Sequence, residues 1–156
     1  MPMSRLMSKL IQTQCVRLLA VAAGVLAGAC SEPPDDSPQQ QMQERLVGTW
    51  LREYQEDAIQ VRRVLVLASD GRFRESAAVT NAGAPLAEHA HAGVWRFDGT
   101  NLKRRYTQTD GRKPAAPMVP FATFEIRFQS PDEFVGLDHV RRRQLRYRRV
   151  AEGTAP

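Results

Sequence analysis

The chain has 156 residues, a length that suits one domain with appendages, and its lysines and arginines exceed its acidic residues, 22 against 17. Only two cysteines occur, which excludes a disulfide-dense scaffold. Three of the basic residues, Arg5, Lys9 and Arg17, fall in a segment that we expect to be removed, so the net charge drops from +5 to +2. A nearly balanced exported domain is not expected to bind nucleic acid.

Residues 1–29 are typical of a signal peptide. A basic start precedes the uncharged apolar run 18–29, which is shorter than the roughly 20 residues of a spanning helix. Prolines and aspartates follow at 33–36. We therefore predict that residues 1–29 are removed. The alternative is a short membrane anchor.

The segment Leu26-Ala27-Gly28-Ala29-Cys30 resembles the lipobox of bacterial lipoproteins, with Ala27 where that family prefers leucine. The resemblance implies that Cys30 becomes the first mature residue and carries palmitate-type acyl chains, which would make the membrane a partner. Each buried methylene of such chains contributes about 0.8 kcal/mol. Ser31 in place of aspartate favours the outer membrane, so we expect a lipid-anchored envelope protein facing the periplasm. The alternative is that Cys15 and Cys30 are ordinary cytosolic cysteines.

Residues 30–43 are predicted to be the lipidated cysteine and a flexible linker, because the segment is polar and has no apolar period. A short helix is expected at its end. Ser37 suits an N-cap, Pro38 the first helical position and Gln40 a capping box, while Gly48 would stop the helix.

From Leu46 onward, short apolar and β-branched runs alternate with turn signals, which indicates strands. The pairs Asp70-Gly71, Asp98-Gly99 and Asp110-Gly111 favour tight hairpins, and Ser130-Pro131-Asp132 is a further turn signal. Loops are expected at 81–85 and 112–117. The predicted strands are 48–55, 60–68, 72–80, 90–97, 101–108, 120–129, 133–138 and 142–150.

This pattern predicts an all-β fold. Eight consecutive antiparallel strands close into a small up-and-down barrel, which removes exposed edges. We expect the barrel to span residues 44–150 and residues 151–156 to form a disordered tail. The alternative is an open sandwich, since the number of strands does not fix closure.

The domain opens with Gly48-Thr49-Trp50, which resembles the Gly-x-Trp motif of lipocalins and of small bacterial lipocalin-like domains. The resemblance implies an arginine of the last strand, Arg148 or Arg149, lying across the Trp50 ring. Gly93-Val94-Trp95 also suits those bacterial domains. The chain lacks the long helix that follows the last strand in full-size lipocalins, and a large ligand cavity is therefore not expected.

Alternation along the strands places an aromatic set and several arginines on inward faces. We predict that the barrel binds a small apolar or amphipathic ligand and that Arg104 orients an anionic group of it. Arg63 and Arg143 are also predicted to point inward, with Glu75 as a partner. The alternative places these arginines at the rim, with wet heads. The predicted ligand-binding residues are Trp50, Trp95, Phe97, Arg104, Tyr106, Phe124, Ile126, Phe128 and Tyr147.

Other functions have weaker support in the sequence. His89 and His91 have a spacing used by metal sites, but His139 is the only other histidine, so we predict neither a metal nor another cofactor. The arginines after residue 140 could contact lipid phosphates or simply be solvated.

No catalytic motif is present, and we predict that the chain is not an enzyme. A metal-dependent hydrolase using the two histidines is the weakest alternative. The main alternative to ligand binding is a filled barrel that docks an envelope protein.

Overall fold

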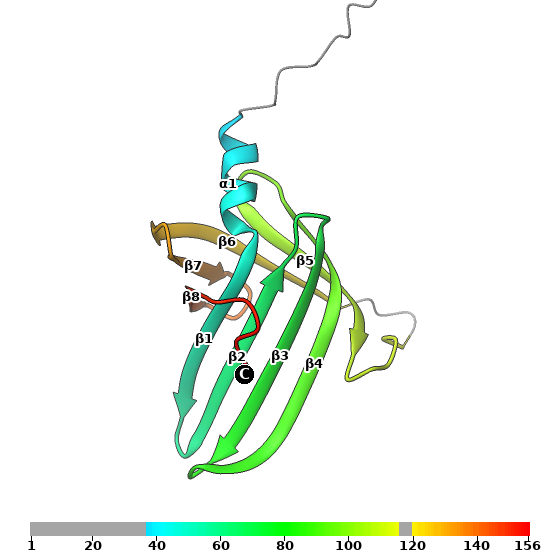
Figure 1. Cartoon of the computed structure of the whole chain (residues 1–156), viewed down its shortest axis with the longest axis vertical. Coiled ribbons are helices and arrows are strands. Elements are labelled where there is room, and N and C mark those ends of the chain that lie inside the picture. The colour runs from blue at the N-terminus through cyan, green and yellow to red at the C-terminus, as the bar shows by residue number, and fades with distance from the viewer. Residues whose placement is uncertain (1–36, 116–119) are drawn as a thin grey trace, which may run out of the picture. The chain divides into compact units, whose positions relative to one another are not determined.

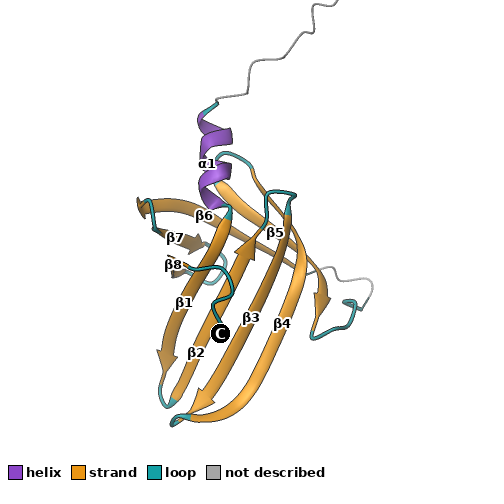
Figure 2. Cartoon of the chain, in the orientation of Figure 1, coloured by secondary structure: helices purple, strands orange, loops and turns teal. Residues whose placement is uncertain are grey.

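The computed structural model describes residues 37–115 and 120–156, which belong to one compact unit, Asp35–Pro156. One helix precedes a closed antiparallel barrel in which each strand pairs with its neighbours in sequence and the first strand pairs with the last (Figures 1 and 2). The predicted barrel is thus confirmed, and the alternative of an open sandwich is wrong. The elements are α1 (Pro38–Leu46), β1 (Gly48–Glu56), β2 (Ile59–Leu67), β3 (Arg72–Asn81), β4 (Ala84–Phe97), β5 (Asn101–Thr109), β6 (Phe121–Ser130), β7 (Glu133–Asp138) and β8 (Arg143–Val150).

The helix expected before the barrel is present as α1. The Ser37 hydroxyl accepts a hydrogen bond from the Gln40 amide at 3.2 Å, and Pro38 occupies the first helical position. A serine cap of this kind satisfies one of the free amides of the first turn. The signal peptide, Cys30 and the linker before Ser37 lie outside the described residues. Within the described ranges, no helix is long and apolar enough to cross a membrane.

The predicted loop at 81–85 is wrong. β3 continues to Asn81 and β4 begins at Ala84, so Ala82 and Gly83 alone connect them. Both residues have positive φ, 48° and 83°, which is the geometry of a two-residue hairpin turn. Alanine seldom adopts this conformation, so Ala82, the first residue of the turn, is not a turn signal in the sequence. As a result, β4 begins six residues before the predicted position 90.

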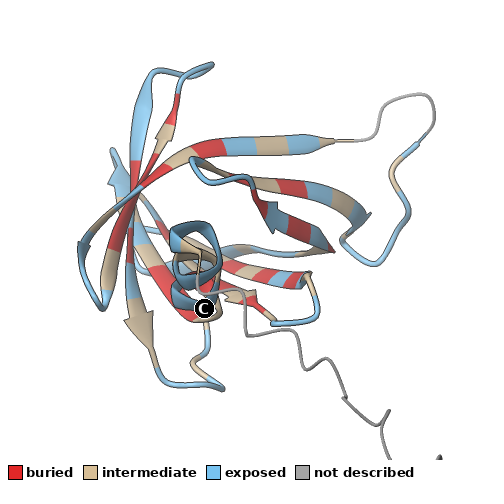
Figure 3. Cartoon of the chain, turned by 90° about the horizontal axis from the view of Figure 1, so that it is seen from above, coloured by how far each residue is buried: buried red, intermediate tan, exposed pale blue. Residues whose placement is uncertain are grey.

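The barrel interior is packed solid at the end where α1 lies. Strand alternation turns apolar side chains inward, and the bands of buried residues in Figure 3 follow this period. Met42 and Leu46 of α1 pack on this core and cover its end. The aromatic members of the core are Trp50, Phe73, Trp95, Phe97, Phe124, Phe134 and Tyr147, with Phe128 packed against them.

Trp50 and Arg149 join α1 to the barrel. The Trp50 indole donates a hydrogen bond to the Leu46 carbonyl at 2.8 Å, and the Arg149 guanidinium lies 4.2 Å from the centre of the Trp50 ring. Arg149 also donates to the carbonyls of Arg45 (2.6 Å) and Val47 (2.9 Å) at the end of the helix. The expected stacked arginine is therefore confirmed as Arg149. Gly48 suits this place for two reasons: its φ is 137°, which side chains disfavour, and a Cβ there would push the Arg149 guanidinium from its position.

The segment 151–156, expected from the sequence to be a disordered tail, contacts the outer wall of the barrel. The Arg62 guanidinium donates to the Ala155 carbonyl at 3.1 Å, and the Thr154 amide donates to the Ala151 carbonyl at 3.2 Å. Val64 faces outward, yet it is only 3 % exposed, because the tail lies beside it.

We expect Arg149→Met to lower the free energy of unfolding by about 2 kcal/mol, because it removes a shielded cation–π contact and charge-assisted hydrogen bonds. Arg148→Met is the matched control, since Arg148 makes only an exposed ion pair with Glu53; its loss should cost less than about 1 kcal/mol. Urea unfolding followed by tryptophan fluorescence measures both. Equal effects of the two substitutions would contradict the role given to Arg149.

Candidate ligand site in the open half of the barrel

A cavity of about 330 Å³ occupies the half of the barrel away from α1. It lies where strand pairing runs out on two sides. β1 pairs with β8 only as far as Leu51, and β5 pairs with β6 only as far as Arg105. Beyond these points neither pair of strands is paired further among the described residues, apart from one hydrogen bond from the Tyr106 amide to the Pro120 carbonyl at 3.0 Å. The cavity is lined by Arg52, Tyr54, Arg63, Glu75, His91, Arg104, Tyr106, Thr109, Pro120, Phe121, Ala122, Phe124, Arg141, Arg143, Leu145 and Tyr147.

The floor of the cavity is formed by Tyr147 and Arg104. On its far side Tyr147 stacks on Phe134 of the packed half, with ring centres 4.9 Å apart. The Arg104 guanidinium lies between 5.3 and 5.5 Å from the ring centres of Phe73, Tyr106 and Phe124. Aromatic rings around a guanidinium provide a low-polarity environment that still favours a cation.

Glu75 neutralises part of the charge on this floor. Its side chain is fully buried and accepts hydrogen bonds from Arg63 at 2.5 Å and from Arg104 at 2.6 Å. Burial alone would raise the pKa of Glu75, but the charges and hydrogen bonds of Arg104 and Arg63 outweigh it and lower that pKa. Burial likewise opposes the charge on Arg104, and Glu75 more than offsets it, so the pKa of Arg104 is raised. The expected partnership of the interior arginines with Glu75 is thus present.

Three buried nitrogen atoms around the cavity have no hydrogen-bond partner. They are Nε of Arg63, Nε of Arg104 and Nδ1 of His91, and they are the only such side-chain atoms in the part of the chain that the structure describes. All three belong to residues that line the cavity. An unpaired buried polar atom costs about 1–3 kcal/mol, so the concentration of all three at one cavity marks a place that suits a polar ligand.

Arg52 is the lining arginine with the most available charge. It is partly buried and lies over the Tyr54 ring at 4.1 Å, and it forms no ion pair among the described residues. Burial lowers the pKa of Arg52, partly opposed by the phenols of Tyr147 and Tyr54, and the charges of Arg143 and Arg63 lower it further. A guanidinium held in this way gains more from an anion than one that already has a carboxylate partner.

The side chains at the rim of the cavity are more exposed to solvent than those on its floor. Arg141 and Arg143 pair with Asp138 at 3.3 and 3.7 Å, and the Arg143 side chain is 45 % exposed. Of the arginines predicted to point inward, Arg143 therefore lies at the rim, as the alternative proposed, whereas Arg104 lies inside the barrel. Five arginines and only one carboxylate line the cavity, which makes it strongly basic.

The nine residues predicted to bind a ligand divide between the two halves of the barrel. Arg104, Tyr106, Phe124 and Tyr147 line the cavity. The other five lie in or against the packed core, and their role in ligand binding stays a prediction. Alternation gives the face on which a residue lies but not its depth along the barrel axis, which is why both groups were indistinguishable in the sequence. The five residues in the packed half are Trp50, Trp95, Phe97, Ile126 and Phe128.

The sequence prediction missed Arg52, Tyr54 and His91 as members of the site. A signal for the first two was available, because Arg52 and Tyr54 share the inward alternation of Trp50. His91 contacts the edge of the Tyr106 ring with centres 5.6 Å apart, while His89 lies 3.3 Å from Asp110. Across residues 37–115 and 120–156 no group of three potential ligands could hold a metal ion.

Comparison with known proteins gives no family assignment. No protein-family model matches the chain, and no curated protein matches it in sequence.

Glu75→Gln should destabilise the protein by about 3–5 kcal/mol at pH 7, because it leaves two inward guanidinium groups without their counter-charge. Because the folded-state pKa of Glu75 is lowered, its contribution is complete above the ordinary glutamate pKa of about 4.3 and is lost as the pH falls through the lower folded-state value. The unfolding temperature measured from pH 7 to pH 2 should therefore fall in acid, and less steeply in the variant.

The control is Glu53→Gln, which removes a carboxylate that is 48 % exposed and paired with Arg62 and Arg148 on the surface. It should cost less than about 1 kcal/mol. If Glu75→Gln is as mild as this control, the two interior arginines do not depend on Glu75.

Proposed function

We propose that this barrel is a binding module for a small amphipathic anion, held in the open half of the barrel. The observation that carries the proposal is that every buried side-chain nitrogen without a partner among the described residues belongs to a residue lining one basic cavity. An anionic group with several acceptor oxygens, such as a carboxylate, would satisfy the Nε–H donors of Arg63 and Arg104. Nothing in this role requires catalysis, which agrees with the absence of catalytic motifs from the sequence.

The size of the cavity limits the ligand. A volume of about 330 Å³ is at the lower end of the range of small-molecule sites, about 300–1,000 Å³. The packed half of the barrel leaves no space beyond Tyr147 and Phe134. We therefore infer that a short molecule, or one end of a longer one, enters the cavity.

Arg52 is our candidate for the primary contact with the anionic group, with Arg63 and Arg104 adding their free Nε donors. An arginine side chain offers a planar fork that matches a carboxylate. Arg63 and Arg104 already donate hydrogen bonds to Glu75, whereas Arg52 has no carboxylate partner among the described residues, so its guanidinium is the one that an incoming anion would not have to share. Arg104, first expected to orient the anion, would then support it from the floor.

We also propose that the chain is a lipoprotein of the cell envelope, attached through acyl chains on Cys30 and facing the periplasm from the outer membrane. The resemblance of residues 26–30 to a lipobox supports this, as does the short apolar segment before them. The polar linker would let the barrel extend away from the lipid.

A second candidate is a docking module without a small ligand. The solid packing of the α1 half favours it, because about half of the interior is filled by side chains of the chain itself. The two candidates differ in what they predict for the cavity.

Titration calorimetry with decanoate and with uncharged decanol separates them. We expect decanoate to bind at least tenfold more tightly than decanol. Arg52→Gln should weaken the affinity for decanoate about tenfold, which is about 1.4 kcal/mol of binding free energy, and leave the affinity for decanol unchanged. Arg62→Gln is the matched control, since Arg62 faces outward on the adjacent strand. No binding of either compound to the parent protein would favour the docking module.

The lipid anchor has a separate test. Cys30→Ala should move the protein from the membrane fraction to the soluble envelope fraction, because no acyl chain can then be attached. Metabolic labelling with a palmitate analogue should mark the parent protein and not the variant. Unchanged membrane attachment and labelling in Cys30→Ala would disprove lipidation at this residue.

A further inference from the structure

The outer wall formed by β3, β4 and β5 carries a group of basic side chains. Phe73, Trp95 and Arg104 point into the barrel, so the residues that alternate with them point outward. We call this wall the basic face and define it by five side chains. They are Arg72, Arg74, Arg96, Lys103 and Arg105.

Two exposed apolar side chains lie among these cations. The strand register places Arg72 opposite Val94, Val94 opposite Arg105, and Arg105 opposite Phe121, so the four form one row across β3 to β6. Val94 is 38 % and Phe121 67 % exposed. Arginine next to an exposed aromatic or aliphatic group is a combination found where proteins meet lipid head groups, since each part suits one layer of that interface.

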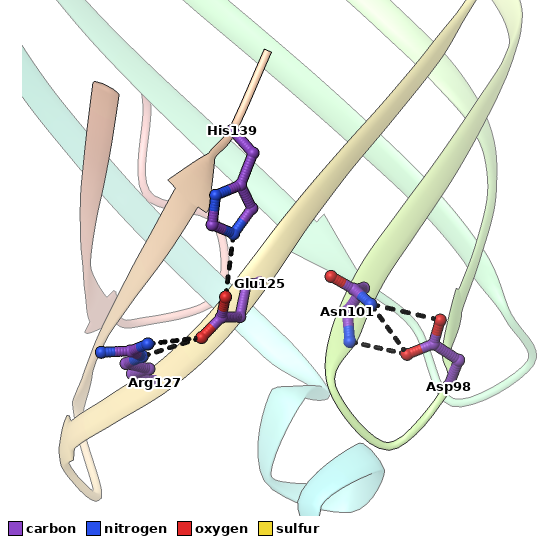
Figure 4. Close-up of polar contacts among 5 residues, drawn as sticks. All are labelled: Asp98, Asn101, Glu125, Arg127 and His139. Atoms are coloured by element: carbon purple, nitrogen blue, oxygen red, sulfur yellow. Dashed lines mark hydrogen bonds and ion pairs between the residues drawn. The ribbon is translucent and has the colours of Figure 1, made fainter. Parts of the chain in front are cut away.

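Most of the charge on the basic face is not neutralised. Among the described residues, Arg74, Arg96 and Arg105 take part in no ion pair. Arg72 and Lys103 have aspartate partners, Asp70 at 3.7 Å and Asp98 at 2.6 Å, and these belong to the turns at one end of the strands. Asp98 also accepts hydrogen bonds from Asn101 (Figure 4), so it is engaged within its own turn.

The wall formed by β6, β7 and β8 differs in this respect. On that wall Arg127 and His139 both pair with Glu125 (Figure 4), Arg146 pairs with Glu133, and Arg148 pairs with Glu53. The C-terminal arginines, which the sequence suggested as contacts for lipid phosphates, are thus mostly engaged with carboxylates. The available positive charge lies on the other side of the barrel.

The basic face also contains a groove. A hollow of about 480 Å³ is bordered by Val66, Arg72, Arg74, Val94 and Thr107, and by Asp70, the partner of Arg72, at the turn. It gives a phosphate group room to approach Arg72 and Arg74 while an acyl chain or glycerol contacts the two valines.

We propose that the basic face docks against the surface of an anionic phospholipid bilayer. Unpaired arginines supply the attraction to lipid phosphates, and Val94 and Phe121 reach the level of the head groups. This contact is distinct from the lipid anchor proposed at Cys30 and shares only Phe121 with the lining of the interior cavity, and the charged residues that carry it belong to neither.

The test uses the full chain with Cys30→Ala, which carries no acyl chain, and vesicle flotation at low salt. One vesicle preparation is pure phosphatidylcholine and the other contains phosphatidylglycerol as well. The N-terminal segment with Arg5, Lys9 and Arg17 also favours the anionic vesicles, but it is identical in the parent and in the variants compared below, so a difference between those chains comes from the barrel. We expect binding to increase at least tenfold with the anionic lipid and to weaken as salt is added.

The triple substitution Arg74→Gln, Arg96→Gln and Arg105→Gln should reduce binding to the anionic vesicles about 100-fold. The matched control is Arg127→Gln, Arg146→Gln and Arg148→Gln, which removes the same charge from the opposite wall and should bind as the parent does. Equal binding of the parent to both vesicle types would overturn the proposal. So would equal losses in the two triple variants, or binding to polyglutamate without binding to vesicles.

Discussion

The barrel depends on a short seam between its first and last strands. Only three pairs join β1 to β8, and the central one is Trp50 opposite Arg149. The same two residues stack on each other and hold the end of α1, so the seam, the helix and the core are fixed together. A seam of three pairs would be a weak closure alone, because an unpaired edge exposes backbone donors and acceptors. The contacts of Arg149 compensate for its length.

The same short seam accounts for the cavity. β1 continues to Glu56 after it has left β8, with β2 as its only partner there. Arg52 and Tyr54 lie on this continuation and point into a space that no facing strand fills. One half of the barrel is therefore a conventional core, and the other is open and lined with charge. A structure of this kind separates the part that stabilises the fold from the part available for binding.

Glu75 shows why the charged half is better explained by binding than by stability. A buried ion pair is often no more stabilising than apolar side chains of the same volume, because desolvation offsets the attraction. The chain nevertheless places two arginines around one carboxylate and leaves a nitrogen of each without a partner. Apolar residues would have filled this half as they fill the other. The retention of excess positive charge in a cavity therefore fits a site for an anion.

Local signals in the sequence were enough for the fold, but not for the site. Asp-Gly turns and alternating side chains predicted the barrel, and the resemblance of Gly48-Thr49-Trp50 to the lipocalin motif implied the arginine over the Trp50 ring. The sequence placed a loop at 81–85 but did not show that the turn is only two residues long, because alanine seldom adopts the positive φ that Ala82 has. The division of the interior into a packed half and an open half depends on where strand pairs end, which is a property of the assembled sheet.

The surroundings of each arginine are a second property that the sequence alone does not give. Adjacent residues of β5 have opposite surroundings: Arg104 is buried against Glu75, while Arg105 is exposed and unpaired among the described residues. Both residues add one positive charge to the composition, but only an arginine without a carboxylate partner is available to attract an anion. In the proposed arrangement the basic face lies on the outer side of β3, β4 and β5, whereas the cavity lies inside the barrel in the half away from α1, and Phe121 borders both. A membrane held against that side would meet the cavity only at Phe121, so surface attachment and ligand binding use otherwise separate residues.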